Sequence, residues 1–371
     1  MSTGRRIIVV GGGPAGVAAG LAAKRHDAAA EVRVLSDERQ EPYEKPPLSK
    51  TVLTGKAMPH HAPIAGPKGV CGHGVQLELG TTVKALDLGA HTLVTNTGER
   101  IAYDALVLAT GSTNRVLPMF PYGRRGVHYL RIKTSVVEIA PRILARVANA
   151  ELSALIHERH RTRGVDIRVA AAPTALRELP DGRLAVDTET DSMIAADLIV
   201  VGAGVAPDDR LAREAGLAVS DGIIVDRHGR TSDPAVFAAG DCARFPGPRG
   251  PIRLENWRHA QEHGAIAGRN AAGGDVAYDV VPSFWSEQHD MYIQGVGWPV
   301  AEPSTRVRRP VGPGGLLLLE FEGPRLVYVS GINAQRDIAV ARRLIERGIP
   351  VDHSDVADAD KPLAALLKAK V

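Results

Sequence analysis

A glycine-rich turn near the start of the chain has the residue types and spacing that bind a dinucleotide. Gly11, Gly13 and Gly16 form a G-x-G-x-x-G pattern, in which glycine lets the backbone approach a pyrophosphate closely. The apolar residues 7–10 before it read as a buried strand, and residues 17–24 after it read as a helix. The free N–H groups of that helix attract phosphate. The turn therefore predicts a dinucleotide site.

Two acidic residues follow the next predicted strand, residues 31–35. Asp37 lies about 20 residues past the glycines, where a carboxylate accepts a bond from a ribose hydroxyl. Asp37 is the favoured ribose ligand and Glu38 is the alternative. A solvated turn after a strand would also explain either residue taken alone.

Length and composition indicate a globular protein with two or three domains. The chain has 371 residues, of which 44% are hydrophobic and 23% are charged. No stretch approaches the ~20 apolar residues of a membrane span, and no signal-peptide pattern is present at the N-terminus. The net charge is only +3. We therefore expect a cytoplasmic protein with neither a membrane nor a nucleic acid as partner.

The cysteines and histidines give no sign of redox or metal chemistry. Cys71 and Cys242 form no C-x-x-C pattern, which favours unpaired structural thiols in a reducing compartment. The histidine-rich residues 58–61 lack the carboxylates that would complete a metal site. No metal is predicted.

The elements that must position the glycine turn follow an α/β order. Residues 42–50 form a proline-rich segment that we expect to enter a helix at Ser49. Three short segments then alternate like antiparallel strands: 77–79, 83–86 and 91–94. Residues 104–111 form an apolar strand that ends at Thr110 and Gly111.

Three motifs in this order resemble one enzyme family. Residues 42–50, Ala109-Thr110-Gly111 and the F-A-A-G-D run 237–241 resemble the FAD-dependent NAD(P)H reductases that serve ferredoxins and rubredoxins. These are reductase components of oxygenase and P450 systems, and apoptosis-inducing factor shares their architecture. The resemblance continues through residues 222–226, 253–257 and 284–288, so it covers nearly the whole chain.

The resemblance implies an α/β fold in three parts. A Rossmann-like FAD domain would comprise residues 1–112 and 232–277. A second Rossmann-like domain, truncated here, would be inserted at residues 113–231. A C-terminal α/β domain would comprise residues 278–371.

The resemblance also assigns the FAD contacts. Gly11, Gly13 and Gly16 would hold the pyrophosphate, and Asp37 would hold the adenosine ribose. Lys45 stands where the family usually has arginine, so it keeps the charge but loses the bidentate fork. Lys50 would lie beside flavin N5 as the catalytic residue that stabilises reduced, anionic flavin.

Further flavin contacts follow from the second half of the chain. Asp241 would bond the ribityl chain, and the helix that begins near Trp257 would direct its N-terminus at the pyrimidine edge of the flavin. Trp285 would either pack near the isoalloxazine or belong to the core. The remaining implied FAD contacts are Pro14, Ala15, Val83, Ala109, Thr110, Gly111, Arg115, Gly240, Asn256 and Ala260.

The central stretch departs from the family pattern. Residues 126–131 resemble the lead-in to the NAD(P)H domain, and residues 136–146 resemble its second strand and linker. The strand, glycine turn and helix expected between them are missing, a loss of roughly 40 residues by the usual size of a βαβ unit. Residues 202–207 cannot replace the turn, because they lack its third glycine and Asp208 and Asp209 would repel a pyrophosphate. NAD(P)H is therefore not expected to bind.

The truncated domain and the tail still have clear patterns. We predict a helix at 150–163, a strand at 165–169, a hairpin at 175–190 and a hairpin loop at 312–315. Strands at 316–321 and 326–329 and helices at 337–347 and 362–370 complete the tail. The missing elements should expose apolar faces, which favours a homodimer or a stable hetero-complex.

Three functions stay open from the sequence. The first is an FAD oxidoreductase that exchanges electrons with a substrate, a ferredoxin-like redox protein or an oxygenase partner. The second is a non-catalytic FAD-binding subunit. The third is the family reaction, NAD(P)H-dependent ferredoxin reduction, with an improvised nicotinamide site.

Overall fold

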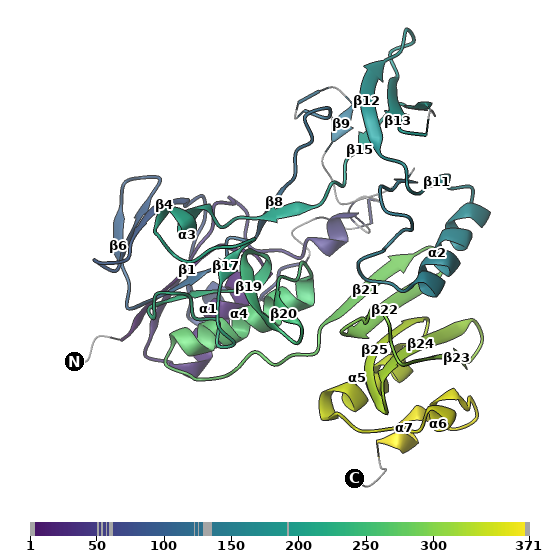
Figure 1. Ribbon diagram of the computed structural model, residues 1–371. Coiled ribbons are helices and arrows are strands. Elements are labelled where there is room, and N and C mark those ends of the chain that lie inside the picture. The colour runs from purple at the N-terminus through teal and green to yellow at the C-terminus, as the bar shows by residue number, and fades with distance from the viewer. Residues whose placement is uncertain are drawn as a thin grey trace. The chain divides into compact units, whose positions relative to one another are not determined.

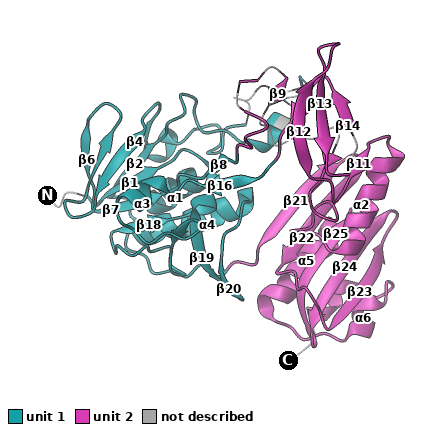
Figure 2. Ribbon diagram, turned by 45° about the horizontal axis from the view of Figure 1, so that its top comes forward, with its two compact units in different colours: residues 1–115, 203–279 teal, residues 116–202, 280–371 magenta. Residues whose placement is uncertain are grey.

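The chain folds into two compact units, each of which takes two separate stretches of sequence. The computed structural model describes residues 4–49, 52, 55, 56, 58, 62–121, 123, 124, 126–128, 136–190 and 193–367. Unit 1 comprises Met1–Arg115 and Ala203–Asp279, and unit 2 comprises Val116–Gly202 and Val280–Val371 (Figure 2). Both units mix helices and strands, which confirms the predicted α/β class.

Unit 1 is built on a parallel five-stranded sheet with the strand order β18-β7-β1-β2-β3, of which Figure 2 labels the first four strands. Its strands are β1 (Arg6–Val10), β2 (Glu31–Leu35), β3 (Gln76–Glu78), β7 (Ala105–Leu108) and β18 (Val236–Ala238). β7 is buried along its whole length, as a parallel strand covered on both faces should be.

One strand differs from its expected pairing. Residues 77–79 were expected to be part of an antiparallel set, but β3 pairs parallel with β2. The prediction was wrong because three residues carry no signal for strand direction. Hydrogen-bond partners distant in sequence decide that direction.

Two helices of unit 1, α1 (Pro14–His26) and α4 (Trp257–Ala271), pack against each other. A Cβ added at Gly264 would lie 2.1 Å from the carbonyl oxygen of Ala15, and one at Gly268 would lie 2.0 Å from that of Ala19. The two backbones therefore meet at van der Waals distance. This contact brings the glycine turn beside the second half of the chain.

Smaller elements complete unit 1. They are the 3-10 helices η1 (Pro46–Ser49), η3 (Cys71–His73) and η4 (Gly240–Cys242), α3 (Arg210–Glu214), and the strands β4 (Val83–Asp87), β5 (Thr92–Thr95), β6 (Arg100–Ala102), β8 (Ser112–Asn114), β16 (Val205–Pro207), β17 (Ile223–Ile224), β19 (Ala243–Gly247) and β20 (Gly250–Ile252). The antiparallel pairing of β4 with β5 confirms the prediction for that hairpin. Ser49 belongs to η1, which begins at Pro46, and the helix expected to continue from Ser49 falls on residues that lie partly outside the described ranges.

Unit 2 contains a five-stranded antiparallel sheet with the order β21-β22-β25-β24-β23. Its strands are β21 (Ser283–Gln288), β22 (Met291–Gly297), β23 (Thr305–Val311), β24 (Gly315–Glu322) and β25 (Arg325–Ile332). The predicted strands at 316–321 and 326–329 are confirmed, and residues 312–314 form the predicted loop between β23 and β24.

Helices cover both faces of this sheet. On one face α5 (Gln335–Arg347), α6 (His353–Ala357) and α7 (Leu363–Leu366) close an apolar core. On the other face α2 (Ala150–Thr162) buries Leu152 and Ile156 against Ile293 and Leu318 (Figure 1). The helix of the truncated domain is therefore covered inside its own unit.

The rest of the truncated domain consists of short ladders. β9 (Val127–His128) pairs with β15 (Ile199–Val200), and β10 (Val136–Val137) pairs with β11 (Ile167–Arg168), both in parallel. β12 (Pro173–Glu178), β13 (Leu184–Thr188) and β14 (Met193–Ala196) form an antiparallel meander, which includes the predicted hairpin.

A salt bridge at the start of the unit 1 sheet gives a prediction for acid unfolding. The Arg6 backbone N–H and guanidinium donate to Asp104 at 2.7 and 2.8 Å, and these hydrogen bonds lower the pKa of Asp104 to about 2. A carboxyl with a depressed folded pKa stabilises the fold above its unfolded pKa, about 3.9, and this contribution is lost as the pH falls through about 2. Because both side chains are nearly half exposed, the effect should be modest and weaken with salt.

The measurement is urea unfolding of the wild type and Asp104→Asn at pH 5, 4, 3 and 2. The wild type should be the more stable at pH 5, and the difference should shrink steadily toward pH 2. A difference that stays constant over this range would contradict the assignment.

Candidate functional site

The glycine turn joins β1 to α1 with two glycines that the protein needs for its own packing. Gly11 has a φ of +119°, and a Cβ there would lie 2.2 Å from the carbonyl oxygen of Ala109. A Cβ at Gly16 would lie 1.8 Å from the carbonyl oxygen of Gly11. Both positions therefore exclude a side chain whether or not a ligand is bound.

Gly13 has a different role, because no atom lies within 4 Å of the place where its Cβ would be. Gly13 is the N-cap of α1, makes no side-chain capping bond, and is followed by a first turn without acidic residues. The N-terminus of α1 therefore has no side-chain cap and no acidic residue in its own first turn. This cradle fits a pyrophosphate.

The two candidate ribose ligands have different surroundings. Lys45 donates a hydrogen bond to Glu38 at 2.8 Å. Burial alone would lower the pKa of Lys45, but this bond and the charge of Glu38 raise it overall. Asp37 is exposed at the end of β2. Since Glu38 is engaged by Lys45, we propose Asp37 as the ribose acceptor.

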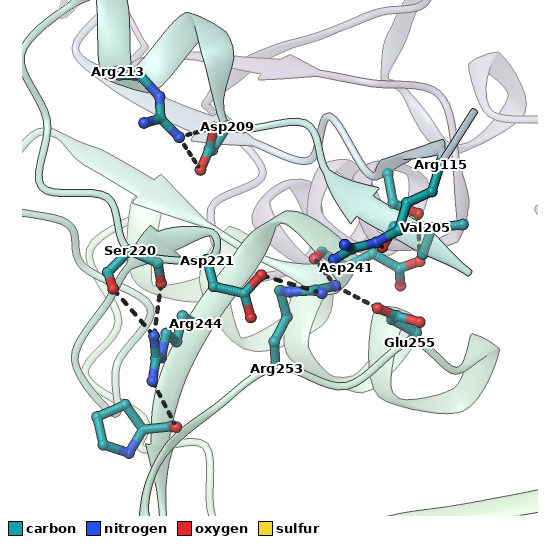
Figure 3. A network of polar contacts seen from close by, with 12 residues as sticks. Arg115, Val205, Asp209, Arg213, Ser220, Asp221, Asp241, Arg244, Arg253 and Glu255 are labelled. Atoms are coloured by element: carbon teal, nitrogen blue, oxygen red, sulfur yellow. Dashed lines mark hydrogen bonds and ion pairs between the residues drawn. The ribbon is translucent and has the colours of Figure 1, made fainter. Parts of the chain in front are cut away.

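The end of β7 holds the segment that returns from unit 2. Thr110 donates from its hydroxyl to the carbonyl oxygen of Asp208 at 2.6 Å, and the Asp208 N–H donates to the carbonyl of Gly111 at 2.9 Å. Arg115 donates from Nε to the carbonyl of Val205 at 2.9 Å (Figure 3). These three predicted site residues thus have backbone-holding roles in the structure.

Three elements that are distant in sequence meet at the turn that carries Asp241. A Cβ at Gly240 would lie 2.8 Å from the Cβ of Ala15 in α1 and 3.7 Å from that of Ala260 in α4. Asp241 accepts a hydrogen bond from the hydroxyl of Ser112 at 3.0 Å. The start of α1, the 240–241 turn and the first turn of α4 therefore form one continuous wall.

The helix α4 begins where the sequence predicts. Asn256 is its N-cap, and its side chain accepts from the N–H of His259 at 2.8 Å. Trp257 is the first helical residue. The positive end of the α4 dipole therefore lies close to the Asp241 turn.

Two buried histidines of α4 support this wall and were missed from the sequence. His259 Nδ1 lies 2.7 Å from the hydroxyl of Tyr278, and the N–H of Gly240 donates to His263 Nδ1 at 3.4 Å. Burial lowers the pKa of His263 to about 3, and it also holds the pKa of His259 well below its usual value. Both imidazoles are therefore neutral. Their i, i+4 spacing on one helix face was the available signal.

Three further predicted contacts remain untested. Lys50, the predicted catalytic residue, lies outside the described residues. Val83 is buried at the start of β4. Trp285 lies on β21 in unit 2 and is partly buried there. The roles predicted for these residues stay predictions.

The sequence matches two known protein-family profiles over most of its length. The profile described as "Pyridine nucleotide-disulphide oxidoreductase" matches residues 5–134 and 122–264, and the one described as "Reductase C-terminal" matches residues 283–367. The chain belongs to the pyridine nucleotide-disulphide oxidoreductase family. Within it, the chain is a ferredoxin/rubredoxin reductase-like FAD oxidoreductase, as its relatives show.

Relatives of this oxidoreductase are reductase components of oxygenase systems. The 5,5'-dehydrodivanillate O-demethylase ferredoxin reductase subunit of Sphingobium is 31% identical, with 98% of each chain covered. The anthranilate 1,2-dioxygenase system ferredoxin–NAD(+) reductase component of Burkholderia cepacia is 31% identical, with 95% of this chain and 96% of that protein covered. The structure of a covalent putidaredoxin reductase–putidaredoxin complex superposes with a TM-score of 0.89, at 26% identity and 98% coverage of both chains.

The comparisons also bear on the nicotinamide site of this oxidoreductase. The alignment with the Sphingobium subunit has 407 positions against 371 residues here, so at least 36 of its positions have no residue in this chain. The family profile matches in two stretches that overlap at residues 122–134, which supports the predicted loss at that place. However, the name of the Burkholderia protein includes NAD(+). Similarity to this relative therefore gives no support to the prediction that NAD(P)H does not bind.

The described part of the chain offers neither a metal-binding cluster nor a membrane-spanning helix. Among the residues that the structure describes, no cluster of His, Cys, Asp and Glu is suited to hold a metal ion. No helix within the described ranges is long and apolar enough to cross a bilayer.

Proposed function

We propose that this oxidoreductase binds FAD in unit 1 and transfers electrons between the flavin and a small ferredoxin-like protein. The observation that carries the proposal is the uncapped N-terminus of α1 at Gly13, which the chain leaves open and free of acidic residues. Bound FAD would supply the exchange between two-electron and one-electron steps. The names of the relatives, which pair reductases with ferredoxins, point to the same class of partner.

Different residues of this chain would bind FAD and tune the reactivity of the flavin. The N–H groups of α1 bind the pyrophosphate and Asp37 binds the ribose. Asp241, oriented by Ser112, binds the ribityl chain. The N-terminus of α4 stabilises negative charge at the pyrimidine edge of the flavin. Lys50 stays the proposed cation beside flavin N5.

The electron donor is the point where we expect this chain to differ from relatives such as the Burkholderia reductase component, whose name includes NAD(+). We infer that NAD(P)H reduces this chain slowly, because α2 is a poor pyrophosphate site. Residues 138–149, between β10 and α2, contain no glycine. The N-cap Asn149 accepts from the N–H of Leu152 at 2.9 Å, and Glu151 puts a negative charge in the first turn. This N-terminus is capped and acidic, whereas that of α1 is open and neutral.

Anaerobic flavin reduction tests both parts of the proposal. The purified yellow protein is mixed with NADH, NADPH, a reduced ferredoxin or dithionite at equal reducing equivalents, and flavin bleaching is followed by absorbance. We expect fast bleaching with reduced ferredoxin and dithionite, and bleaching at least tenfold slower with either nicotinamide. Equally fast bleaching by NADH or NADPH would contradict the slow-donor inference and restore the reaction named for the relatives. A flavin that resists every donor would instead indicate a structural subunit.

Association with a second copy or with a permanent partner stays a prediction. Ile139, Met193 and Leu198 of unit 2 are between half and two-thirds exposed. These apolar side chains lie in the truncated domain, where the missing elements were expected to uncover such surface.

A further inference from the structure

Arg253 lies between the two segments that carry the second half of the proposed FAD site. It follows β20 and precedes Asn256, the N-cap of α4, and its side chain is only 9% exposed. Its Nη1 donates to the backbone carbonyl of Asp241 at 3.2 Å and lies 2.8 Å from a carboxylate oxygen of Glu255 (Figure 3). One guanidinium nitrogen thus joins the Asp241 turn to the residue before the α4 N-cap.

The other terminal nitrogen of Arg253 reaches a third segment. Nη2 lies 3.6 Å from a carboxylate oxygen of Asp221, in the loop before β17. The guanidinium is therefore held between two carboxylates and a carbonyl that come from three places in the sequence. A buried cation is tolerated only when it is paired in this way, since removing one partner leaves an uncompensated charge.

Arg253 and Ser112 fix opposite ends of Asp241. Ser112 donates to the side-chain carboxylate at 3.0 Å, and Arg253 donates to the backbone carbonyl of the same residue. Neither the peptide plane nor the side chain of Asp241 can then rotate freely. Arg253 thus bridges the backbone carbonyl of Asp241 and the side chain of Glu255, the residue before the α4 N-cap.

We propose that Arg253 is a positioning residue for the flavin: it fixes the separation between Asp241 and the N-terminus of α4, and thereby sets the affinity for FAD and the flavin reduction potential. The proposal rests on the proposed function, since it requires FAD in unit 1. The physical link is the α4 dipole, whose stabilisation of reduced flavin depends on its distance from the ring. Loss of the Arg253 guanidinium should therefore destabilise the reduced flavin and weaken FAD binding.

The test compares Arg253→Lys and Arg253→Met with a control, Arg244→Met. Arg244 is a partly buried neighbour on β19, and its guanidinium donates to the carbonyls of Ser220 at 2.9 Å and Pro251 at 3.4 Å (Figure 3). The readouts are the midpoint potential of the bound flavin, its visible circular dichroism, and the FAD dissociation constant of the apoprotein.

We expect Arg253→Met to bind FAD about tenfold more weakly and to shift the midpoint potential by about 30 mV to more negative values, the equivalent of tenfold for a two-electron couple. Arg253→Lys keeps the charge but bonds in one direction only, so it should show a smaller shift of the same sign. The control should keep the wild-type potential, spectrum and affinity.

Several outcomes would overturn the proposal. Wild-type potential and dichroism in Arg253→Met, with only a lower melting temperature, would mean a purely structural role. If Arg253→Met does not fold, a wild-type potential in Arg253→Lys would also refute the proposal. A wild-type protein that binds no FAD would contradict the proposed function itself, which is a distinct result.

Discussion

The Gly16→Ala variant should lose FAD binding and about 3 kcal/mol of folding free energy, the upper end of the usual cost of overpacking. The new Cβ would lie 1.8 Å from the carbonyl oxygen of Gly11. That carbonyl cannot retreat easily, because the N–H of Gly11 donates to Leu35 at 2.8 Å and anchors the turn to β2. Alanine is the better helix former by about 1 kcal/mol, but this gain is smaller than the cost of the clash.

Gly13→Ala is the matched variant that separates the ligand from the fold. Gly13 has φ −77° and ψ −175°, which alanine adopts without strain, and nothing lies within 4 Å of its Cβ position. The fold should therefore keep its stability, whereas the methyl group should intrude on the pyrophosphate and weaken FAD binding at least tenfold.

The two variants are measured as apoproteins, so that lost stabilisation by FAD is not counted as lost folding energy. Urea unfolding gives the stability, and FAD fluorescence quenching gives the affinity. Wild-type stability in Gly16→Ala would refute the clash. Wild-type FAD affinity in Gly13→Ala would show that the dinucleotide does not lie at the α1 N-terminus.

The second large effect is expected in unit 2, where Arg309→Met should cost about 3 kcal/mol, the upper end of the usual cost of leaving a buried hydrogen-bonding group without its partner. Arg309 is 3% exposed on β23, and its Nη atoms donate to the carbonyls of Val356, Asp358 and Lys361 at 2.6 to 2.8 Å, with a longer bond to Ala359. Methionine would leave the carbonyls of Val356 and Lys361 without this donor, whereas the carbonyl of Asp358 would keep the N–H of Lys361 at 3.3 Å. The α6 segment would then detach from the sheet.

Arg308→Met is the control for this prediction. Arg308 is the neighbour of Arg309 on the same strand, but it is exposed and pairs with the exposed Glu151 at 2.8 Å. Its loss should cost about 0–1 kcal/mol. Because a protein with several units need not unfold in one step, the measurement is amide hydrogen exchange of residues 350–367 together with calorimetry. Equal exchange rates in the two variants would contradict the role of Arg309 in holding the α6 segment to the sheet.

Local sequence determined the parts of this protein whose signal lies within a few neighbouring residues. Gly11, Gly13 and Gly16 between an apolar run and an alanine-rich helix predicted β1, the turn and α1, because backbone sterics and periodicity act over short distances. The strands around residues 312–315 were found in the same way, whereas the α4 N-terminus at Trp257 was predicted from the family resemblance. The lack of a second glycine turn was noticed only by comparison with the family pattern.

Tertiary structure alone decided which of these residues meet. Only the fold pairs Glu38 with Lys45, brings Gly240 against Ala15, and gives Arg253 three partners from separate segments. The parallel direction of β3 and the packing of α2 against the C-terminal sheet could not be predicted from the sequence either. The physical reason is that hydrogen bonds and apolar contacts form between residues that the fold brings together, however far apart those residues lie in the sequence. A sequence pattern indicates which residues require a hydrogen-bond partner or burial, and long-range packing decides which other residue provides it.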